Sequence, residues 1–503
     1  MNLLIRHQEM GENMRHPLSN HRASLSTIAT WAMFSRGLEP EFDIAVHKQL
    51  AHIEGPARED DPQIKDLTHL PWCSIDNDDS RDLDQLTAIK EIGFSQMQVY
   101  VAIADVDALV MKDSAIDAHA RHNTTSVYTS ARIFHMLPER LCTDLTSLNQ
   151  DQDRLALVIE MVFSEDAVLE SSKLYRAKVR NKAKLAYDAV SDWIENNAEL
   201  PETARRVVGM DQQLRWQDGL AQKLRVLRKA QGSLEFETFQ PRALFAGERI
   251  VDIRQQPQNR ARQLIEELMI ASNGCTARFL AAHGCASLRR VVRSPERWQR
   301  IVDVANGYGV TLPRQPDGQA LEAFLARQHQ ADPLRFPDLS LVIIKLMGSG
   351  EYVVEDPEGE AIGHFGLAVQ DYMHSTAPNR RYPDLLTMRL IKAALSGSPM
   401  PYTTEELKEL AEHCTAQEDA AQKVERQVRK SEAALLLHSR IGQKFDALVT
   451  GADAQGAWVR IFEPPAEGRL RSDVADLRVG QSLRVKLVST SVERGFIDFV
   501  QAH

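Results

Sequence analysis

The residues of this chain best suited to chemistry lie in a short acidic stretch, residues 74–85. Its sequence is Ser-Ile-Asp-Asn-Asp-Asp-Ser-Arg-Asp-Leu-Asp-Gln, which places five carboxylates within nine residues. Carboxylates this close raise one another's pKa, and a divalent cation relieves their repulsion by coordination. The stretch therefore predicts a metal site whose ligands are drawn from five aspartates: Asp76, Asp78, Asp79, Asp82 and Asp84.

Two other interpretations of this stretch fit less well. In an EF-hand calcium loop that begins at Asp76, the sixth residue is Gly and the twelfth is Glu, but the chain has Arg81 and Thr87 there. A merely solvated acidic loop does not account for the apolar residues that flank and interrupt the acids, namely Trp72, Ile75, Leu83 and Leu86. Their alternation with the acids predicts that Asp82 and Asp84 point to one side while Leu83 points into a core. Oxygen ligands without His or Cys favour the hard ions Mg²⁺ and Mn²⁺.

Four segments along the chain supply the elements that must position this stretch. Residues 1–65 have helical periodicity and predict a helical module, either a helix-turn-helix nucleic-acid binder or a plain packing unit. Residues 66–395 alternate strand-like and helical runs, which predicts a large mixed α/β domain, and residues 396–440 read as its helical extension. Residues 441–503 contain short strands between turns, as in a five-stranded OB barrel. Three barrel aromatics are candidates for base stacking, namely Phe445, Trp458 and Phe462, and for Phe445 a core role is the favoured alternative.

Length and composition indicate a globular α/β protein of several domains. The chain has 503 residues, of which 43% are hydrophobic. It lacks both an apolar run long enough to span a membrane and the apolar region of a signal peptide near its start, so we expect a cytoplasmic protein without membrane contact. The five cysteines form no Cys-x-x-Cys pair, which indicates reduced thiols rather than a zinc site or a disulfide framework. We expect a monomer.

The charge distribution points to a localised attraction for nucleic acid. A net charge of −10 argues against a protein that coats nucleic acid, because phosphate contacts need a basic surface. Residues 173–184 nevertheless contain six Lys or Arg residues and no acidic residue. This run is either a solvated strand face or one wall of a narrow basic channel, and both interpretations remain open at this point.

Five ordered motifs resemble those of the exoribonuclease II (RNB) family. The first is Ser74-Ile-Asp76 followed by Asp82-Leu-Asp84, which is similar to the family's catalytic motif. The later ones are Ser126-Val-Tyr128 with Met136-Leu-Pro138 and Leu145-Thr-Ser-Leu148, the stretch 264–273, His364-Phe-Gly-Leu367, and the stretch 372–385. With an S1-type barrel at the end, the resemblance covers about residues 66–500.

This resemblance implies a function and a catalytic set. The function is processive 3′→5′ hydrolysis of single-stranded RNA to nucleoside 5′-monophosphates, with two Mg²⁺ ions, or Mn²⁺ in their place, at the end of a narrow channel. Asp76, Asp82 and Asp84 would hold the ions, and Arg380 would contact the scissile phosphate. Arg381 lies beside Arg380 and either binds RNA or pairs with Asp384. Glu425 would lie at the active-site end of the channel, or else form a salt bridge on the helix surface.

The resemblance also implies contacts to RNA. Tyr128 would stack on the terminal base, and Phe236 is the candidate for its clamping partner, with a core position as the alternative. Tyr187 would touch RNA farther up the channel, near the basic run. Discrimination against DNA would come from hydrogen bonds to 2′-hydroxyls, with Glu267 as the acceptor and Glu266 as the alternate.

Two departures from the family pattern stand out. Gln85 occupies the position of a fourth aspartate, so one metal ion would have less negative charge around it unless Asp78 or Asp79 compensates. Hydrolysis would then be slower or would favour Mn²⁺. The stretch before the acidic motif is too short for the family's paired cold-shock barrels. Two competing functions follow: an RNA-binding adaptor whose hydrolytic site has decayed at Gln85, and a metal-dependent DNA nuclease.

Overall fold

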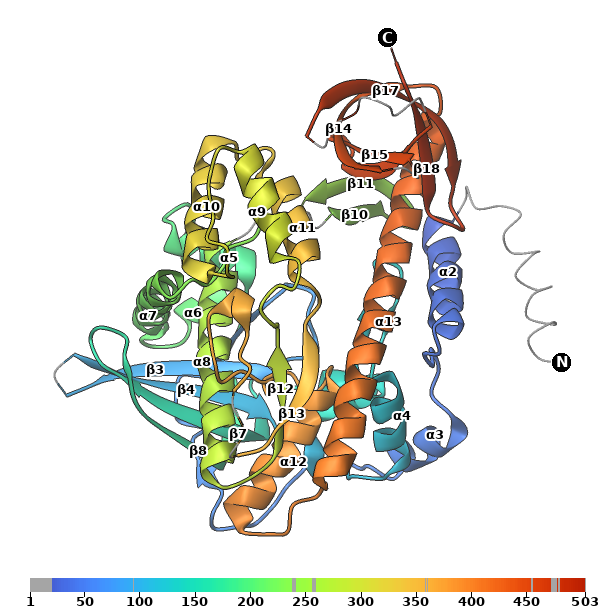
Figure 1. The fold of residues 1–503 in the computed structure, drawn as a ribbon. Helices are drawn as coiled ribbons and strands as arrows, with labels where there is room; N and C mark the ends of the chain where they lie inside the picture. Colours follow the sequence, from blue (N-terminus) through green and yellow to red (C-terminus); the bar gives the residue numbers. More distant parts are fainter. Residues whose placement is uncertain are drawn as a thin grey trace.

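The computed structural model describes residues 20–502, apart from residues 94, 238–240, 256–258, 358, 360, 454–455, 472–476 and 478–479. A mixed sheet and the helices around it form the body of the molecule, and one long helix, α13 (Thr404–Leu437), runs from this body to a C-terminal barrel (Figure 1). The predicted α/β architecture with a terminal β-barrel is confirmed.

The central sheet has seven strands in the order β1-β8-β7-β4-β3-β2-β9. Most neighbours are antiparallel, whereas β1 pairs with β8 and β2 with β9 in parallel. Their bounds are β1 Lys65–Asp66, β2 Cys73–Asp76, β3 Gln85–Ile92, β4 Gln96–Ala104, β7 Asp153–Phe163, β8 Leu169–Arg180 and β9 Ala183–Ala186. The acidic loop, residues 77–84, connects β2 to β3, so the sheet presents the loop at the end of two adjacent strands.

Helices surround this sheet and extend beyond it. Their bounds are α2 His21–Ser35, α3 Ile44–Ala51, α4 Ala115–Asn123, α5 Tyr187–Ile194, α6 Glu202–Arg205, α7 Met210–Ala230, α8 Arg260–Ala282, α9 Trp298–Gly307, α10 Gly318–Ala331, α11 Phe336–Met347, α12 Tyr382–Ser396 and α13. Small strand pairs are β5 Val127–Tyr128 with β6 Ile133–Phe134, β10 Pro241–Ala246 with β11 Arg249–Gln255, and β12 Ser287–Val291 with β13 Glu351–Glu355.

Local sequence explains where two helices that contribute residues to the site, α8 and α13, begin. Asn259 caps α8, because its side chain accepts a hydrogen bond from the backbone N–H of Arg262 at 2.8 Å. Thr403 and Glu406 form a capping box that starts α13: each side chain accepts from the backbone N–H of the other residue, at 3.1 and 2.7 Å. Both helices are thereby held at their first turns.

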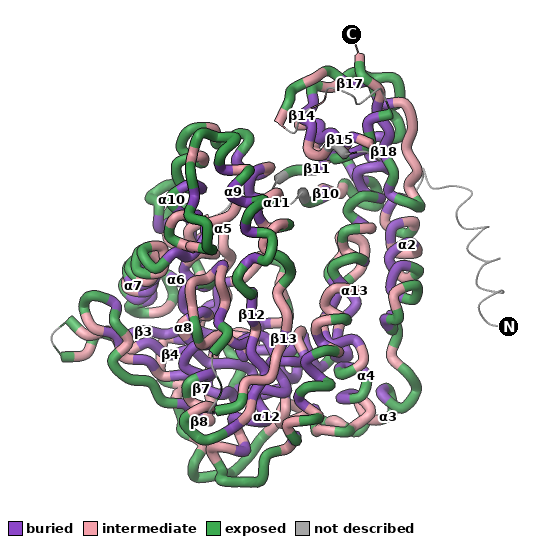
Figure 2. Tube along the Cα trace, in the orientation of Figure 1, coloured by how far each residue is buried: buried purple, intermediate pink, exposed green. Residues whose placement is uncertain are grey.

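The buried side chains form separate apolar clusters. The largest lies around the central sheet with α8 and α12, and Figure 2 shows this concentration of buried chain in the lower body. A second joins α2, α13, the β10–β11 hairpin and the barrel, and a third lies among α9, α10 and α11. All seven residues of the last two turns of α13, Ser431–Leu437, are buried, so this helix end is enclosed on every side.

The barrel is closed, with strand order β14-β15-β16-β18-β17, which agrees with the predicted OB-type fold. Its strands are β14 Lys444–Asp453, β15 Gly456–Ile461, β16 Ala466–Leu470, β17 Ser482–Ser491 and β18 Phe496–Gln501. The Phe445 ring meets Phe499 edge to face, with ring centroids 6.4 Å apart, which favours the core role for Phe445. Trp458 and Phe462 are half-buried and so keep part of their surface accessible to a base.

The two N-terminal helices pack on different partners. α2 lies along α13 and contacts β11, whereas α3 contacts α4 (Figure 1). A helix-turn-helix binder needs its two helices packed as one unit, so this arrangement favours the alternative of plain packing elements. In the part of the chain that the structure describes, no helix is long and apolar enough to cross a bilayer.

A buried ionic network joins α12 to α4 and to the segment that follows β4. The Arg389 guanidinium contacts Asp117 at 2.8 Å and Asp107 at 2.9 Å, and both the Arg389 and Asp117 side chains are 3% exposed. We expect Arg389→Ala to lower the free energy of unfolding by about 3–5 kcal/mol, because it leaves Asp117 buried without its countercharge.

Urea denaturation measures this effect. Arg206→Ala is the matched control, because the Arg206 ion pair with Glu202 is more than 70% exposed on both sides and should contribute less than about 0.5 kcal/mol. Equal losses in the two variants would contradict the prediction.

Candidate active site

Asp84 lies at the centre of the acidic site and is 1% exposed. One carboxylate oxygen, Oδ1, accepts a hydrogen bond from the backbone N–H of Asn379 at 2.8 Å, and Oδ2 accepts one from Nε of Arg380 at 3.3 Å. Burial raises the pKa of Asp84 to about 7; Arg380 opposes this rise and the Asp82 carboxylate adds to it. A positive charge placed beside this carboxylate would therefore stabilise its ionised form.

Asp76 and Asp82 lie in the same electrostatic neighbourhood. Asp76, the last residue of β2, accepts hydrogen bonds from the backbone N–H of Asn77 at 2.7 Å and from the Ser80 hydroxyl at 2.9 Å. Burial raises the pKa of Asp76, and Asp82 raises it further. Asp82 thus raises the pKa of both neighbours, which means that its carboxylate repels those of Asp76 and Asp84.

This donor set fits a hard divalent cation in its chemistry. The three carboxylates supply oxygen ligands alone, and their mutual repulsion is what a bound cation relieves. Protein groups donate hydrogen bonds to Oδ1 of Asp76, to Oδ2 of Asp82 and to both oxygens of Asp84. Within the described residues no three His, Cys, Asp or Glu side chains form a ready-made ligand set. A metal bound there would share these carboxylates with the present donors.

Tyr128 joins the acidic loop to α13. Its hydroxyl donates to Oδ2 of Asp82 at 2.7 Å, and its backbone N–H donates to Oε1 of Glu425 at 3.1 Å. The Tyr128 residue is 37% exposed, so part of its surface is accessible to a base. Burial raises the pKa of Glu425, and Arg429 opposes this rise. The structure thus brings together three of the predicted residues: Asp82, Tyr128 and Glu425.

The two neighbouring arginines have different surroundings. Among the described residues, the Arg380 side chain bonds Asp84 alone through Nε, and it is 43% exposed. Its two terminal nitrogens therefore remain available to a phosphate. Arg381 instead forms a bidentate pair with buried Asp384, at 2.9 and 2.7 Å. This pair corresponds to the structural alternative considered for Arg381.

The remaining residues of the acidic loop point elsewhere. Asp78 and Asp79 are exposed; Lys184 donates to the backbone carbonyl of Asp78 at 3.1 Å, and Arg242 of β10 pairs with the Asp79 carboxylate at 3.1 Å. Gln85 is the first residue of β3 and lies opposite Ile103 of β4. The contact with Arg242 directs Asp79 toward the β10–β11 hairpin, so the structure lends little support to its compensating for Gln85.

Arg262 is a site residue that the sequence analysis missed. Its guanidinium lies 4.4 Å from the ring centroid of Tyr187 and donates to Oδ1 of Asn77 at 2.7 Å. Tyr187 is thereby placed at the acidic loop. The available signal was helical spacing, because Arg262 and Glu266 are four residues apart on α8 and so share a face.

Of the two glutamates in α8, Glu266 is the accessible one. Glu267 is 3% exposed, and Arg228 binds both of its carboxylate oxygens, at 2.8 and 2.5 Å. Glu266 is exposed. A 2′-hydroxyl could therefore reach Glu266, the alternate acceptor, more readily than Glu267.

Phe236 lies in the segment between α7 and β10. It is half-buried and packs against the apolar cluster of α9, α10 and α11. Its role as a clamping partner stays a prediction, and the core position has the more direct support.

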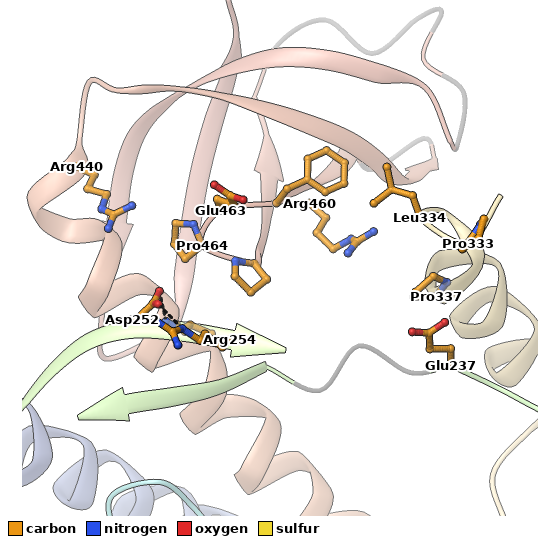
Figure 3. A pocket seen from close by; sticks show the side chains of 13 residues that line it. Glu237, Asp252, Arg254, Pro333, Leu334, Pro337, Arg440, Arg460, Glu463 and Pro464 are labelled. Atoms are coloured by element: carbon orange, nitrogen blue, oxygen red, sulfur yellow. Dashed lines mark hydrogen bonds and ion pairs between the residues drawn. The ribbon is translucent and has the colours of Figure 1, made fainter. Parts of the chain in front are cut away.

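One cavity borders the acidic loop, and a second lies beside the barrel. A cleft of about 860 Å³ borders the acidic loop, and its lining includes Asp82, Tyr128, Glu425, Arg22 and Arg429. A second cavity, of about 660 Å³, separates the barrel from the β10–β11 hairpin and the start of α11. Arg254, Arg440 and Arg460 extend into this second space from three different elements (Figure 3).

Two family models match the chain. Residues 64–397 match the RNB domain, and residues 443–502 match the RNase II-type exonuclease C-terminal S1 domain. Ribonuclease R of Escherichia coli (strain K12) is 31% identical over 434 residues, which cover 83% of this chain and 52% of that relative. The chain thus spans about half the length of this curated relative.

Solved structures share the fold. Mycoplasma genitalium RNase R in complex with ribose methylated single-stranded RNA has a TM-score of 0.85 and 22% identity, covering 95% of this chain and 78% of the other. Yeast Ssd1, a pseudonuclease, has a TM-score of 0.69 and 15% identity, covering 88% of this chain and 55% of the other. One fold therefore occurs in both a ribonuclease and a pseudonuclease, and the residues of the site must distinguish them.

Proposed function

The chain belongs to the RNB family, and we propose that it is a 3′→5′ exoribonuclease that degrades single-stranded RNA processively to nucleoside 5′-monophosphates. The observation that carries this proposal is a chain of contacts at the acidic loop. Arg380 bonds Asp84, the charge of Asp82 acts on Asp84, and Tyr128 bonds Asp82. A site of this kind combines a metal-binding carboxylate set, a phosphate-binding guanidinium and an aromatic ring for the terminal base. We also propose a monomeric, cytoplasmic protein.

Nucleases of the RNB family are metal-dependent. We propose two Mg²⁺ ions, or Mn²⁺ in their place, with Asp76, Asp82 and Asp84 as the ligands. Ions bound there would supply an activated water and stabilise the charge on the leaving 3′-oxygen. The chain itself holds Asp84 in position through the Asn379 backbone, and Arg380 orients the scissile phosphate through its terminal nitrogens.

The residues of α5 and α8 beside the acidic loop support a preference for RNA. Tyr187 and Arg262 lie against the acidic loop, and Glu266 is exposed on the same face of α8 as Arg262. An exposed carboxylate can accept a hydrogen bond from a 2′-hydroxyl, which DNA lacks. The S1-type barrel supports single-stranded RNA as the partner, because OB folds bind strands through aromatic stacking.

The RNA-binding adaptor remains the second candidate function, because Gln85 replaces an acidic residue and a pseudonuclease shares the fold. One experiment separates the possibilities: the protein is incubated with end-labelled single-stranded RNA or DNA in Mg²⁺ or Mn²⁺. Release of monophosphates from RNA alone supports the proposed function. Binding without cleavage in either metal would establish the adaptor, and cleavage of DNA would establish the DNA nuclease.

Gln85→Asp should increase the rate of RNA hydrolysis in Mg²⁺ about tenfold, because it adds a carboxylate beside the proposed ligands. Calorimetric titration should show tighter Mg²⁺ binding in the same variant. Gln85→Asn is the matched control, since it shortens the side chain equally without adding charge. Equal rates and affinities in the two variants would show that this position does not limit metal binding.

A further inference from the structure

The segment that carries Tyr128, residues 123–132, is held at both ends by the N-terminal helical module. At its start, the Asn123 side chain accepts a hydrogen bond from the backbone N–H of Glu39 at 2.9 Å and donates to the Glu39 carbonyl at 2.8 Å. Asn123 is 2% exposed, so water does not compete for these bonds. The linker between α2 and α3 thus fixes the point at which the segment leaves α4.

The other end of the segment meets α2 and the same linker. Arg22 of α2 donates from Nη1 to the Ser130 carbonyl at 3.1 Å, and its guanidinium lies 4.2 Å from the ring centroid of Phe245 in β10. Arg132 pairs with Glu41 of the linker at 2.8 Å. The module therefore ties the end of the segment both to itself and to the β10–β11 hairpin.

Between these two ends, the segment makes its contacts with the proposed catalytic residues. The backbone N–H of Ser126 donates to the Arg380 carbonyl at 3.0 Å. Tyr128 then bonds Glu425 and Asp82, and the Ser130 hydroxyl donates to Glu432 at 2.6 Å. A shift of the segment would therefore move the Tyr128 ring relative to Arg380 and Asp82.

We propose that the N-terminal module is a brace that positions Tyr128 for the 3′-terminal nucleotide, with Arg22 and Glu41 as its positioning residues. The inference rests on the proposed function, and it assigns a task to residues that lie outside the match to the RNB domain, which begins at residue 64. The Tyr128 segment is held jointly, because it contacts Arg22 and Glu41 of the module as well as Glu425 and Glu432 of α13.

The test compares KM and kcat for hydrolysis of a short single-stranded RNA. Arg22→Met and Glu41→Gln should each raise KM about five- to tenfold and leave kcat within about twofold. Each substitution removes a contact that holds the Tyr128 segment, and neither changes the aspartates of the acidic loop. Arg22→Lys should restore part of the affinity, since its ammonium can still donate to the Ser130 carbonyl. Arg36→Met is the matched control: Arg36 lies in the same module but bonds Gln427 of α13 instead.

A double-mutant cycle with Tyr128→Ala separates a positioning role from general loosening. In the Tyr128→Ala background, Arg22→Met should raise KM no further, because the ring that it positions is gone. An equal increase in KM in both backgrounds, or an equal effect of Arg36→Met on KM, would contradict the positioning role of the N-terminal module. If Tyr128→Ala raises KM and Arg22→Met does not, the brace alone fails; if Tyr128→Ala leaves KM unchanged, the base-stacking role in the proposed function fails first.

Discussion

Asp84→Asn should reduce RNA hydrolysis at least about 1000-fold while the protein still binds RNA. The asparagine has nearly the same shape, and its Oδ1 can still accept a hydrogen bond from the Asn379 backbone or from Arg380. It removes the negative charge that a divalent cation would require. The affinity for single-stranded RNA should stay within about threefold of the parent, because the Tyr128 and Arg380 contacts remain.

Two measurements check this prediction: release of labelled monophosphate in a single turnover, and fluorescence anisotropy of a labelled RNA. Asp166→Asn is the matched control, because Asp166 is an exposed residue of the turn between β7 and β8. A rate for Asp84→Asn above a tenth of the parent rate would contradict the central role of this carboxylate. Loss of both binding and hydrolysis would indicate a damaged fold instead, which thermal unfolding would reveal.

Arg380→Ala should lower kcat about 100- to 1000-fold, the usual effect of removing a charged donor from a developing negative charge. The Arg380 side chain holds Asp84 through Nε and, among the described residues, bonds no other group, so the change removes a proposed phosphate contact and a support for Asp84 together. Arg380→Lys should recover a small part of the rate, because an ammonium keeps the charge but cannot bind two phosphate oxygens in a fork.

The matched control for this series is Arg205→Ala, which removes an exposed guanidinium paired with Glu199 on α6 and its preceding turn. Its kcat should equal that of the parent. Full activity of Arg380→Ala at saturating RNA would show that Arg380 contributes to binding alone, because the defect would then appear in KM.

The sequence predicted the acidic loop and the closed barrel because both depend on local order. Asp82, Leu83 and Asp84 alternate as a chain entering a strand does, and the structure buries Leu83 and starts β3 at the next residue after Asp84. The barrel follows from short strands separated by turn residues. Patterns of this kind are set by neighbours in the chain, and the sequence displays them directly.

The contacts that the sequence could not predict join residues far apart in the chain. Glu267 is withdrawn from solvent by Arg228, Asp79 is directed to Arg242, and Phe236 packs on helices that come after it. Whether a glutamate faces a channel or a buried partner depends on where α7 meets α8, and no spacing rule gives that. The brace around Tyr128 has the same origin, since Arg22 and Ser130 are 108 residues apart.

The enclosed end of α13 affects how this protein can be divided for expression. Ala433–Leu437 is an apolar run covered partly by the barrel, and Gly495 of the barrel packs so tightly on Lys430 that an added Cβ would come within 2.6 Å of its side chain. A fragment that ends before residue 441 would present this run to water, about three turns beyond the residue of α13, Glu425, that binds Tyr128. Such a fragment is a candidate for aggregation during production, so a soluble catalytic piece would need polar replacements along that helix end rather than a simple stop codon.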